Sequence, residues 1–209
     1  RLSSQALPVG GYAYSSCMES AIREGIVKNH TTAFRWISDL FNQGLSVLDL
    51  PVLFLAFDAW SKSELNVLES LNEYLQANRE TEEMLLEDLE MGKSLARILQ
   101  QIDVVRPHLS EPSFVTEFAI AGTHWQIPAE ELATGFSFNW IENQVLVVTK
   151  SLPMGQSKAQ NILDKMIPQI SEGVDRAKEI AQKQEFFEWE FGRSLPGVAI
   201  LSAQHECIK

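Results

Sequence analysis

The stretch Val145-Leu146-Val147-Val148-Thr149 decides the fold class, because its β-branched residues suit a buried strand as well as a helix. No glycine or proline separates this stretch from Trp140. Upstream, Pro128 stands just before Glu130 and Glu131, which is typical of a helix start, since acidic side chains favour the positive end of the helix dipole. One isolated strand has no partner elsewhere in the chain. We therefore expect a helix over residues 128–150 and an all-α protein.

Apolar residues at helical spacing dominate the rest of the chain. One stripe comprises Phe34, Ile37, Phe41, Leu45 and Leu48. Further helices are expected over residues 65–75, 79–101, 114–121 and 156–170, followed by two more toward the C-terminus. No linker, repeat or low-complexity segment separates domains. The prediction is a single-domain helical bundle over residues 1–209, with roughly 8 to 10 helices of ordinary length.

Several helix ends are predicted from cap residues. Ser16 and Ser61 each precede a glutamate by three positions, which is the pattern of a capping box. Asp49 stands before Leu50-Pro51, so it is expected to cap the helix that starts there. Gly25 is placed to end the first helix in a left-handed conformation. Asn29-His30-Thr31 matches a glycosylation sequon, which we attribute to chance.

Composition excludes several classes of function. The net charge of −11 argues against binding to nucleic acid and to an anionic membrane surface, because basic residues must replace the counterions of phosphate groups. The apolar run at residues 50–60 is interrupted and too short to span a bilayer. Cys17 and Cys207 are too few for a disulfide framework, so a reducing, cytoplasmic location is expected.

Acidic residues gather in one region of the chain. Residues 61–92 hold nine acidic and two basic side chains, a local balance of −7. Such a run forms a solvated helix face or, alternatively, a docking face for a basic partner or a cation. Asp88 falls on the apolar seam of the 79–101 helix, which is costly unless it is paired or lines a polar cavity. Gly92 in the same helix costs roughly 1 kcal/mol relative to alanine, so close helix packing is expected there.

No catalytic constellation is visible in the sequence. The histidines lie in no ligand-spaced motif, and His205 and Cys207 are only weak candidates for a metal site, since neighbouring helical residues point about 100° apart. Pro8-Val9-Gly10-Gly11-Tyr12 lacks the lysine and glycine spacing of a phosphate loop and is interpreted as a turn before the first helix. Asn143 and Gln144 are expected to make helix–helix hydrogen bonds. The residues favour protein binding over catalysis.

Five collinear segments resemble the family of the urease accessory protein UreF. They are Ser4-Gln5-Ala6-Leu7-Pro8-Val9-Gly10-Gly11-Tyr12-Ala13-Tyr14-Ser15 with Glu19; Asp49-Leu50-Pro51 after Gly44-Leu45; Arg79-Glu80-Thr81 with Glu87-Asp88 and Met91-Gly92-Lys93-Ser94-Leu95-Ala96-Arg97; Trp140-Ile141-Glu142-Asn143-Gln144-Val145 with Lys150, Pro153 and Met154-Gly155-Gln156; and Ser202-Ala203-Gln204-His205-Glu206. The resemblance covers nearly the whole chain in the right order.

The resemblance implies an all-α, homodimeric chaperone without catalysis. Such a protein joins the accessory protein UreD, also called UreH, and the GTPase UreG on apo-urease. It helps to couple GTP hydrolysis to the insertion of nickel, which passes through internal tunnels, so no tightly bound cofactor is expected and nickel is expected only in transit. Family members usually continue past His-Glu, whereas this sequence ends Cys207-Ile208-Lys209. The family's C-terminal tail is therefore expected to be missing after residue 209.

The resemblance also assigns candidate site residues. Tyr12, Glu19, Lys150 and Gln156 belong to matched segments and are expected to line a partner-binding surface. The alternative for Lys150 is a cation favoured at a helix C-terminus.

Glu87 and Asp88 are expected to line a hydrated channel, where carboxylates offer exchangeable oxygen ligands to a passing cation. For Asp88, a buried pair with Arg79 or Lys93 is equally open. The alternative function is an all-α enzyme with a small-molecule pocket inside the bundle.

Overall fold

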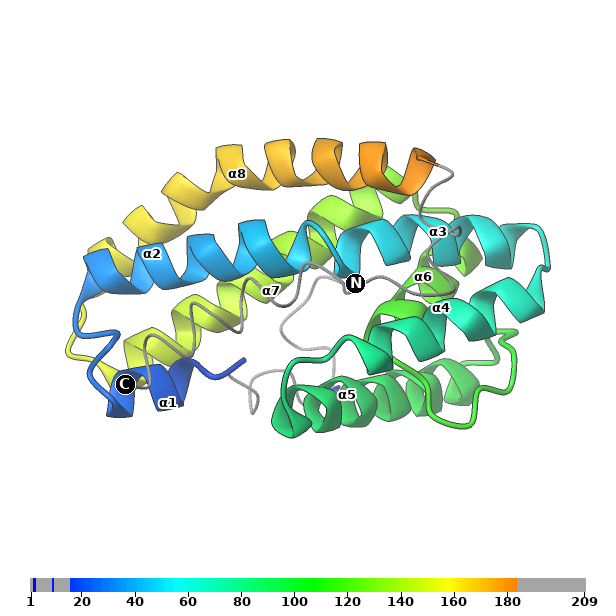
Figure 1. Ribbon diagram of the computed structural model, residues 1–209, viewed down its shortest axis with the longest axis horizontal. Helices are drawn as coiled ribbons and strands as arrows, with labels where there is room; N and C mark the ends of the chain where they lie inside the picture. The colour runs from blue at the N-terminus through cyan, green and yellow to red at the C-terminus, as the bar shows by residue number, and fades with distance from the viewer. Residues whose placement is uncertain (1, 3–8, 10–15, 184–209) are drawn as a thin grey trace.

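The computed structural model describes residues 2, 9 and 16–183, and every regular element within them is a helix (Figure 1). In chain order these are α1 (Met18–Arg23), α2 (His30–Leu40), the π-helix η2 (Phe41–Leu45), α3 (Asp49–Ser61), α4 (Leu65–Ala77), α5 (Glu82–Gln101), α6 (Phe114–His124), α7 (Ala129–Ser151) and α8 (Gln156–Gln182). The predicted all-α fold class is confirmed.

The β-branched stretch at residues 145–149 lies inside α7, as predicted. Val145, Val147 and Val148 are buried there, and α7 packs along α8 and against α1 and α3. Burial on a helix surface offsets the modest β-propensity of these residues, because propensity is only a weak preference that tertiary packing overrides.

Helix α6 is packed between its neighbours in the half of the molecule that also holds α3, α4 and α5 (Figure 1). Residues 114–122 of α6 are all buried, and α3 and α5 pack against this helix. Phe118 of α6 meets Phe136 of α7 edge to face, with ring centroids 5.1 Å apart. A helix that is hidden on all sides is typical of a core element. Gly122 does not end this helix, which runs past the predicted end at residue 121 to His124.

Polar contacts at both ends hold the connection between α5 and α6. Arg106 donates to both carboxylate oxygens of the fully buried Glu117, at 3.0 and 2.6 Å. Asn72 of α4 accepts from the backbone N–H of Ser113 at 2.8 Å and donates to the carbonyl of Glu111 at 2.9 Å. These bonds attach the connection to α4 and to the first turn of α6.

Three predicted caps are wrong, and all three side chains have other partners, Ser61 through a bond from its hydroxyl to the carbonyl of Phe57. Ser16 lies before the N-cap of α1 and donates its hydroxyl to Glu87. Asp49 is already the first residue of α3, and its carboxylate accepts from Arg79 instead of from the helix. The N-cap before α4 has no side-chain bond, so Ser61 forms no capping box and instead ends α3.

The start of α2 carries a capping box that the sequence analysis missed. The Asn29 carboxamide oxygen accepts from the backbone N–H groups of Thr31 and Thr32, at 3.0 and 3.1 Å, and the Thr32 hydroxyl accepts from the Asn29 N–H at 3.1 Å. The residues that match a glycosylation sequon therefore have a structural role as a helix cap. Gly25 has φ of +72°, as predicted for the end of α1.

The prediction of a helix end near residue 170 is wrong, because α8 continues through Pro168 to Gln182. Proline removes one backbone N–H from the helix. Ile170, Val174 and Ala177 nevertheless continue the buried face, and α8 packs against α3 and α7. This continuous apolar contact keeps one long helix where two were expected. The last predicted helix lies outside the described residues.

No single helix among residues 16–183 combines the length and hydropathy needed to cross a bilayer. Only the bent pair formed by residues 30–45 and 49–61 reaches that threshold together. Within this pair, most of α3 is buried in the core.

Candidate functional site

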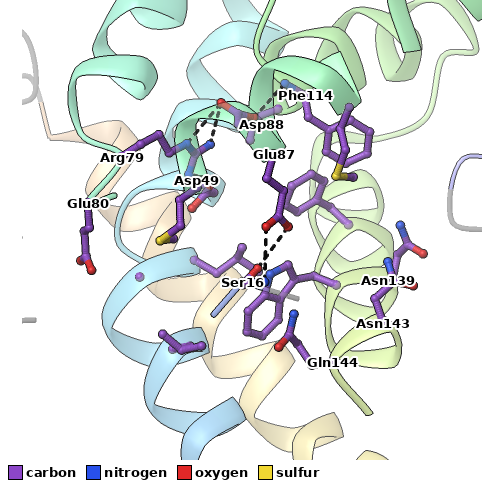
Figure 2. Close-up of a pocket in the computed structure, with 18 residues that line it drawn as sticks. Ser16, Asp49, Arg79, Glu80, Glu87, Asp88, Phe114, Asn139, Asn143 and Gln144 are labelled. Carbon is purple, nitrogen blue, oxygen red and sulfur yellow. Dashed lines mark hydrogen bonds and ion pairs between the residues drawn. The ribbon is translucent and has the colours of Figure 1, made fainter. Parts of the chain in front are cut away.

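A cavity of about 120 Å³ lies between α5, α7 and the junction of α2 with η2 (Figure 2). Buried side chains of α6 and α7, among them Phe114 and Phe136, form its floor. Half-buried residues such as Glu80, Met84 and Trp140 surround them. The cavity thus combines apolar walls with several charged and amide groups.

Arg79 lies between two buried carboxylates at one side of this cavity. It donates to Asp49 at 2.8 Å through Nη1 and approaches Asp88 at 3.1 Å through Nη2. All three side chains are at most 10 % exposed. One guanidinium facing two carboxylates leaves an excess of negative charge. Burial raises the pKa of Asp49 above its ordinary value, although Arg79 opposes the shift.

Asp88 also satisfies the first turn of α6. Its carboxylate accepts from the Ser113 hydroxyl at 2.7 Å and from the backbone N–H of Phe114 at 2.9 Å. Lys93, the other partner considered for Asp88, instead faces Glu90 at 3.5 Å. The predicted pair with Arg79 is therefore formed, and Asp88 also lies at the cavity wall, while its role in a channel stays a prediction.

Glu87 directs its carboxylate at Ser16, which precedes α1 (Figure 2). The backbone N–H and the hydroxyl of Ser16 each donate to it at 3.3 Å. Burial raises the pKa of Glu87 to about 7, while the bonds from Ser16 and the charge of Arg79 act in the opposite direction. A carboxyl group with this pKa exists in both protonation states near neutral pH.

Gln144 of α7 contributes a buried acceptor to the same cavity. Its side chain is 1 % exposed, and its Oε1 has no hydrogen-bond donor among the residues that the structure describes. The expected helix–helix hydrogen bond is therefore not made by this atom. Such an orphaned carbonyl oxygen is unusual, because buried polar atoms nearly always have a partner.

The three predicted partner-binding residues that the structure describes do not line the cavity. Glu19 on α1, Lys150 in the last turn of α7 and Gln156 at the start of α8 are all exposed. Figure 1 shows α1, the C-terminal end of α7 and the N-terminal end of α8 at the same end of the bundle. Folding thus gathers three of the four residues at one end, and Lys150 also stands where a helix dipole favours a cation.

The remaining candidates, Tyr12, His205 and Cys207, lie outside the described residues. In the part of the chain that the structure describes, no three His, Cys, Asp or Glu side chains come together in a geometry that suits a metal ion.

Sequence reasoning missed two features of the cavity. The first is the contact between Ser16 and Glu87, which lie 71 positions apart, so that no local sequence pattern indicates it. The second feature is the pairing of Arg79 with both Asp49 and Asp88. The sequence contained a sign of this pairing, because Arg79 is one of only two basic residues in the acidic region at residues 61–92.

Comparison with known proteins gives a consistent result. A family model for UreF matches residues 27–167. The urease accessory protein UreF of Hahella chejuensis is 41% identical over 208 residues, which cover 98% of this chain and 91% of that protein. The UreF proteins of Marinomonas sp. and Teredinibacter turnerae are 41% and 38% identical, over 99% and 98% of this chain and 88% and 91% of their own lengths. The similarity extends over nearly the full chain.

Proposed function

Because the chain belongs to the UreF family of urease accessory proteins, which act in urease maturation, we propose that it joins a UreD-type accessory protein and a UreG-type GTPase on apo-urease. In this role it is a homodimeric chaperone that helps to couple GTP hydrolysis to nickel insertion. The observation that carries the proposal is the similarity to UreF proteins over 98–99% of the chain.

The exposed end that carries Glu19, Lys150 and Gln156 is the proposed contact surface for the GTPase. These side chains come from three helices, so they present a composite surface that no single peptide segment reproduces. Polar and charged residues at the edge of an interface set its orientation and association rate more than its affinity.

Nickel is proposed to pass through the assembly in transit and without a tightly bound resting site. Of the two channel candidates, Glu87 suits this role better, since it accepts two long bonds of 3.3 Å from Ser16, whereas Asp88 accepts shorter bonds from Arg79, Ser113 and Phe114. A single carboxylate is a weak oxygen ligand, which suits exchange better than storage.

Reconstituted urease activation tests the proposed function. Apo-urease, the UreD-type and UreG-type proteins, GTP and nickel are combined with and without this chain, and urease activity is measured with the nickel content of urease. We expect nickel insertion to require both the chain and GTP hydrolysis. Equal insertion without the chain, or with a non-hydrolysable GTP analogue, would contradict the proposal.

The channel role is tested separately with Glu87→Gln in the same assay. We expect slower nickel insertion with unchanged retention of the GTPase. The matched control is Glu83→Gln, which alters an exposed glutamate one turn earlier on α5. An equal rate for both variants at equal thermal stability would remove Glu87 from the nickel path.

A further inference from the structure

We propose that the cavity between α5, α7 and η2 is a docking pocket for one cationic side chain, a lysine or an arginine, of a partner protein. The inference rests on the proposed function, since it takes the occupant from a protein of the maturation assembly. It assigns a cationic side chain to the cavity as its ligand, whereas the channel role concerns only a nickel ion in transit.

The first argument is the orphaned acceptor in the cavity wall. Gln144 Oε1 is buried without a donor among the described residues, and Gln144 lines the cavity. A buried carbonyl oxygen without a partner costs about 1–3 kcal/mol, and a ligand that donates a hydrogen bond recovers this cost. Ammonium and guanidinium groups donate several hydrogen bonds and accept none.

The second argument is the charge of the wall. Four carboxylates line the cavity, at Asp49, Glu80, Glu87 and Asp88, and Arg79 is the single cation among the described lining residues. Arg79 is already bonded to Asp49 and Asp88. Within the part of the chain that the structure describes, no ion pair forms at Glu80 or Glu87, although the charge of Arg79 acts on Glu87. An incoming positive charge therefore complements the site.

The third argument is the apolar part of the wall, which favours a side chain over a bare metal ion as the ligand. Leu40, Met84 and Trp140 line the cavity beside the polar groups. Lysine and arginine carry an apolar stem below a charged head, so both kinds of wall are matched by one side chain. A metal ion gains nothing from the apolar walls, and no cluster of three metal-binding side chains lies among the described residues.

This inference also accounts for the acidic region at residues 61–92, which supplies Glu80, Glu87 and Asp88 to the cavity. A basic partner is attracted by the region as a whole, and one of its cations is held in the pocket. Steering by the surrounding charges raises the association rate and weakens with salt.

The test uses the full chain labelled with 15N and 13C, with n-butylammonium as a probe for the lysine side chain and n-butanol as its neutral counterpart. NMR follows the side-chain amide of Gln144 and the carboxyl carbon of Glu87. We expect butylammonium, but not butanol, to shift both signals in a saturable manner. We also expect the pKa of Glu87 to fall by about one unit or more when the probe is bound, because a neighbouring cation favours the carboxylate.

Two variants locate the binding site. Gly44 lines the cavity, and a Cβ atom added there meets no atom within 4 Å, so there is room for a side chain to start. Gly44→Leu should therefore fill the cavity and abolish the response. Gly155→Leu is the matched control, because the space around Gly155 is equally open and it lies at the start of α8, outside the cavity. Gln144→Met removes the orphaned acceptor and should weaken probe binding about tenfold without lowering the stability of the free protein.

Three results would overturn the inference. An equal response to butanol would mean that the cavity recognises apolar groups alone. A response to Ni²⁺ but not to butylammonium would make it a metal path, and the absence of any response would leave the cavity without this ligand. All three leave the urease activation assay untouched, so failure of the inference and failure of the proposed function are separable.

Discussion

Asp88 illustrates how one buried side chain joins distant parts of the chain. It binds Arg79, which precedes α5, and it accepts from Ser113 and Phe114 at the start of α6. Through Arg79 it is also connected to Asp49 at the start of α3. Loss of the carboxylate would leave the Ser113 hydroxyl and the Phe114 N–H without this acceptor, and it would leave Arg79 bonded to Asp49 alone of the two carboxylates.

Replacing Asp88 with alanine is expected to lower the free energy of unfolding by about 3 kcal/mol or more. The change removes one of the two buried carboxylates that pair with Arg79, and it removes the acceptor for the Ser113 hydroxyl and the Phe114 N–H. Urea denaturation measures this change. Glu90→Ala on the same helix is the control, since Glu90 only pairs with Lys93 at the surface and should cost less than about 1 kcal/mol. Equal losses in the two variants would contradict the assigned role of Asp88.

The raised pKa of Glu87 is expected to make the free energy of unfolding decrease as the pH rises from 4.5 to about 7. Its pKa is about 7 in the folded chain and 4.5 ordinarily, so between these values the folded state binds more protons than the unfolded state. Raising the pH through this interval therefore favours unfolding. Glu87→Gln should remove this dependence and gain on the order of 2 kcal/mol relative to the wild type between pH 4.5 and 7.

The measurement is chemical denaturation of both proteins at several pH values, with Glu83→Gln as the control. The groups nearest to Glu87, namely Ser16, Arg79 and Asp88, are unchanged in these variants. Parallel stability curves for the wild type and Glu87→Gln would show that the carboxyl group is not perturbed.

Two helical glycines differ in what surrounds them. On Gly92 of α5, an added Cβ would overlap the backbone carbonyl of Pro112, so α5 and the start of α6 approach as closely as only glycine allows. This confirms the predicted close packing. At Gly44 of η2, the same atom would meet nothing within 4 Å.

These surroundings predict opposite effects of one substitution. Gly92→Ala should lower the free energy of unfolding by about 1–3 kcal/mol, because the backbone must shift to accept the methyl group. Gly44→Ala should raise it by about 0.5–1 kcal/mol, since alanine loses less backbone entropy than glycine in a helix. Thermal or urea denaturation of both variants distinguishes them, and the same sign for both would refute the packing argument.

The molecule as a whole separates two regions of different character. One end carries exposed residues from α1, α7 and α8, and the cavity is enclosed by α5, α7 and η2. The long helix α7 belongs to both regions, because Gln144 lines the cavity and Lys150 stands near its C-terminal end. The proposed joining of two partners requires such separate surfaces.

Charge reversal tests the exposed end. Glu19→Lys combined with Lys150→Glu should weaken retention of the UreG-type GTPase in a pull-down, because both side chains are proposed to face it, while the thermal midpoint stays near that of the wild type. The control pair is Glu69→Lys and Lys62→Glu, which exchanges the same charges on exposed residues of α4 and just after α3. Equal retention in both double variants would place the contact surface elsewhere.

Much of the fold was predictable because helix formation depends on neighbours in sequence. The stripe from Phe34 to Leu48 and the buried position of Asp88 follow from the spacing of apolar residues. The helical state of residues 145–149 was inferred because no second strand was expected to pair with them. Cap predictions failed at Ser16 and Asp49, because these polar side chains choose between local backbone groups and distant partners. A short motif carries no information about that competition.

The sequence alone therefore established the all-α class and the family, since apolar periodicity and collinear motifs are properties of the chain itself. Folding was needed to place Glu87 against Ser16, to bury Arg79 between Asp49 and Asp88, and to leave Gln144 Oε1 without a donor. These features depend on side chains meeting across helices and on the exclusion of water between them. Burial and partner choice arise from packing in three dimensions, which is why the cavity and its charge became visible only in the folded molecule.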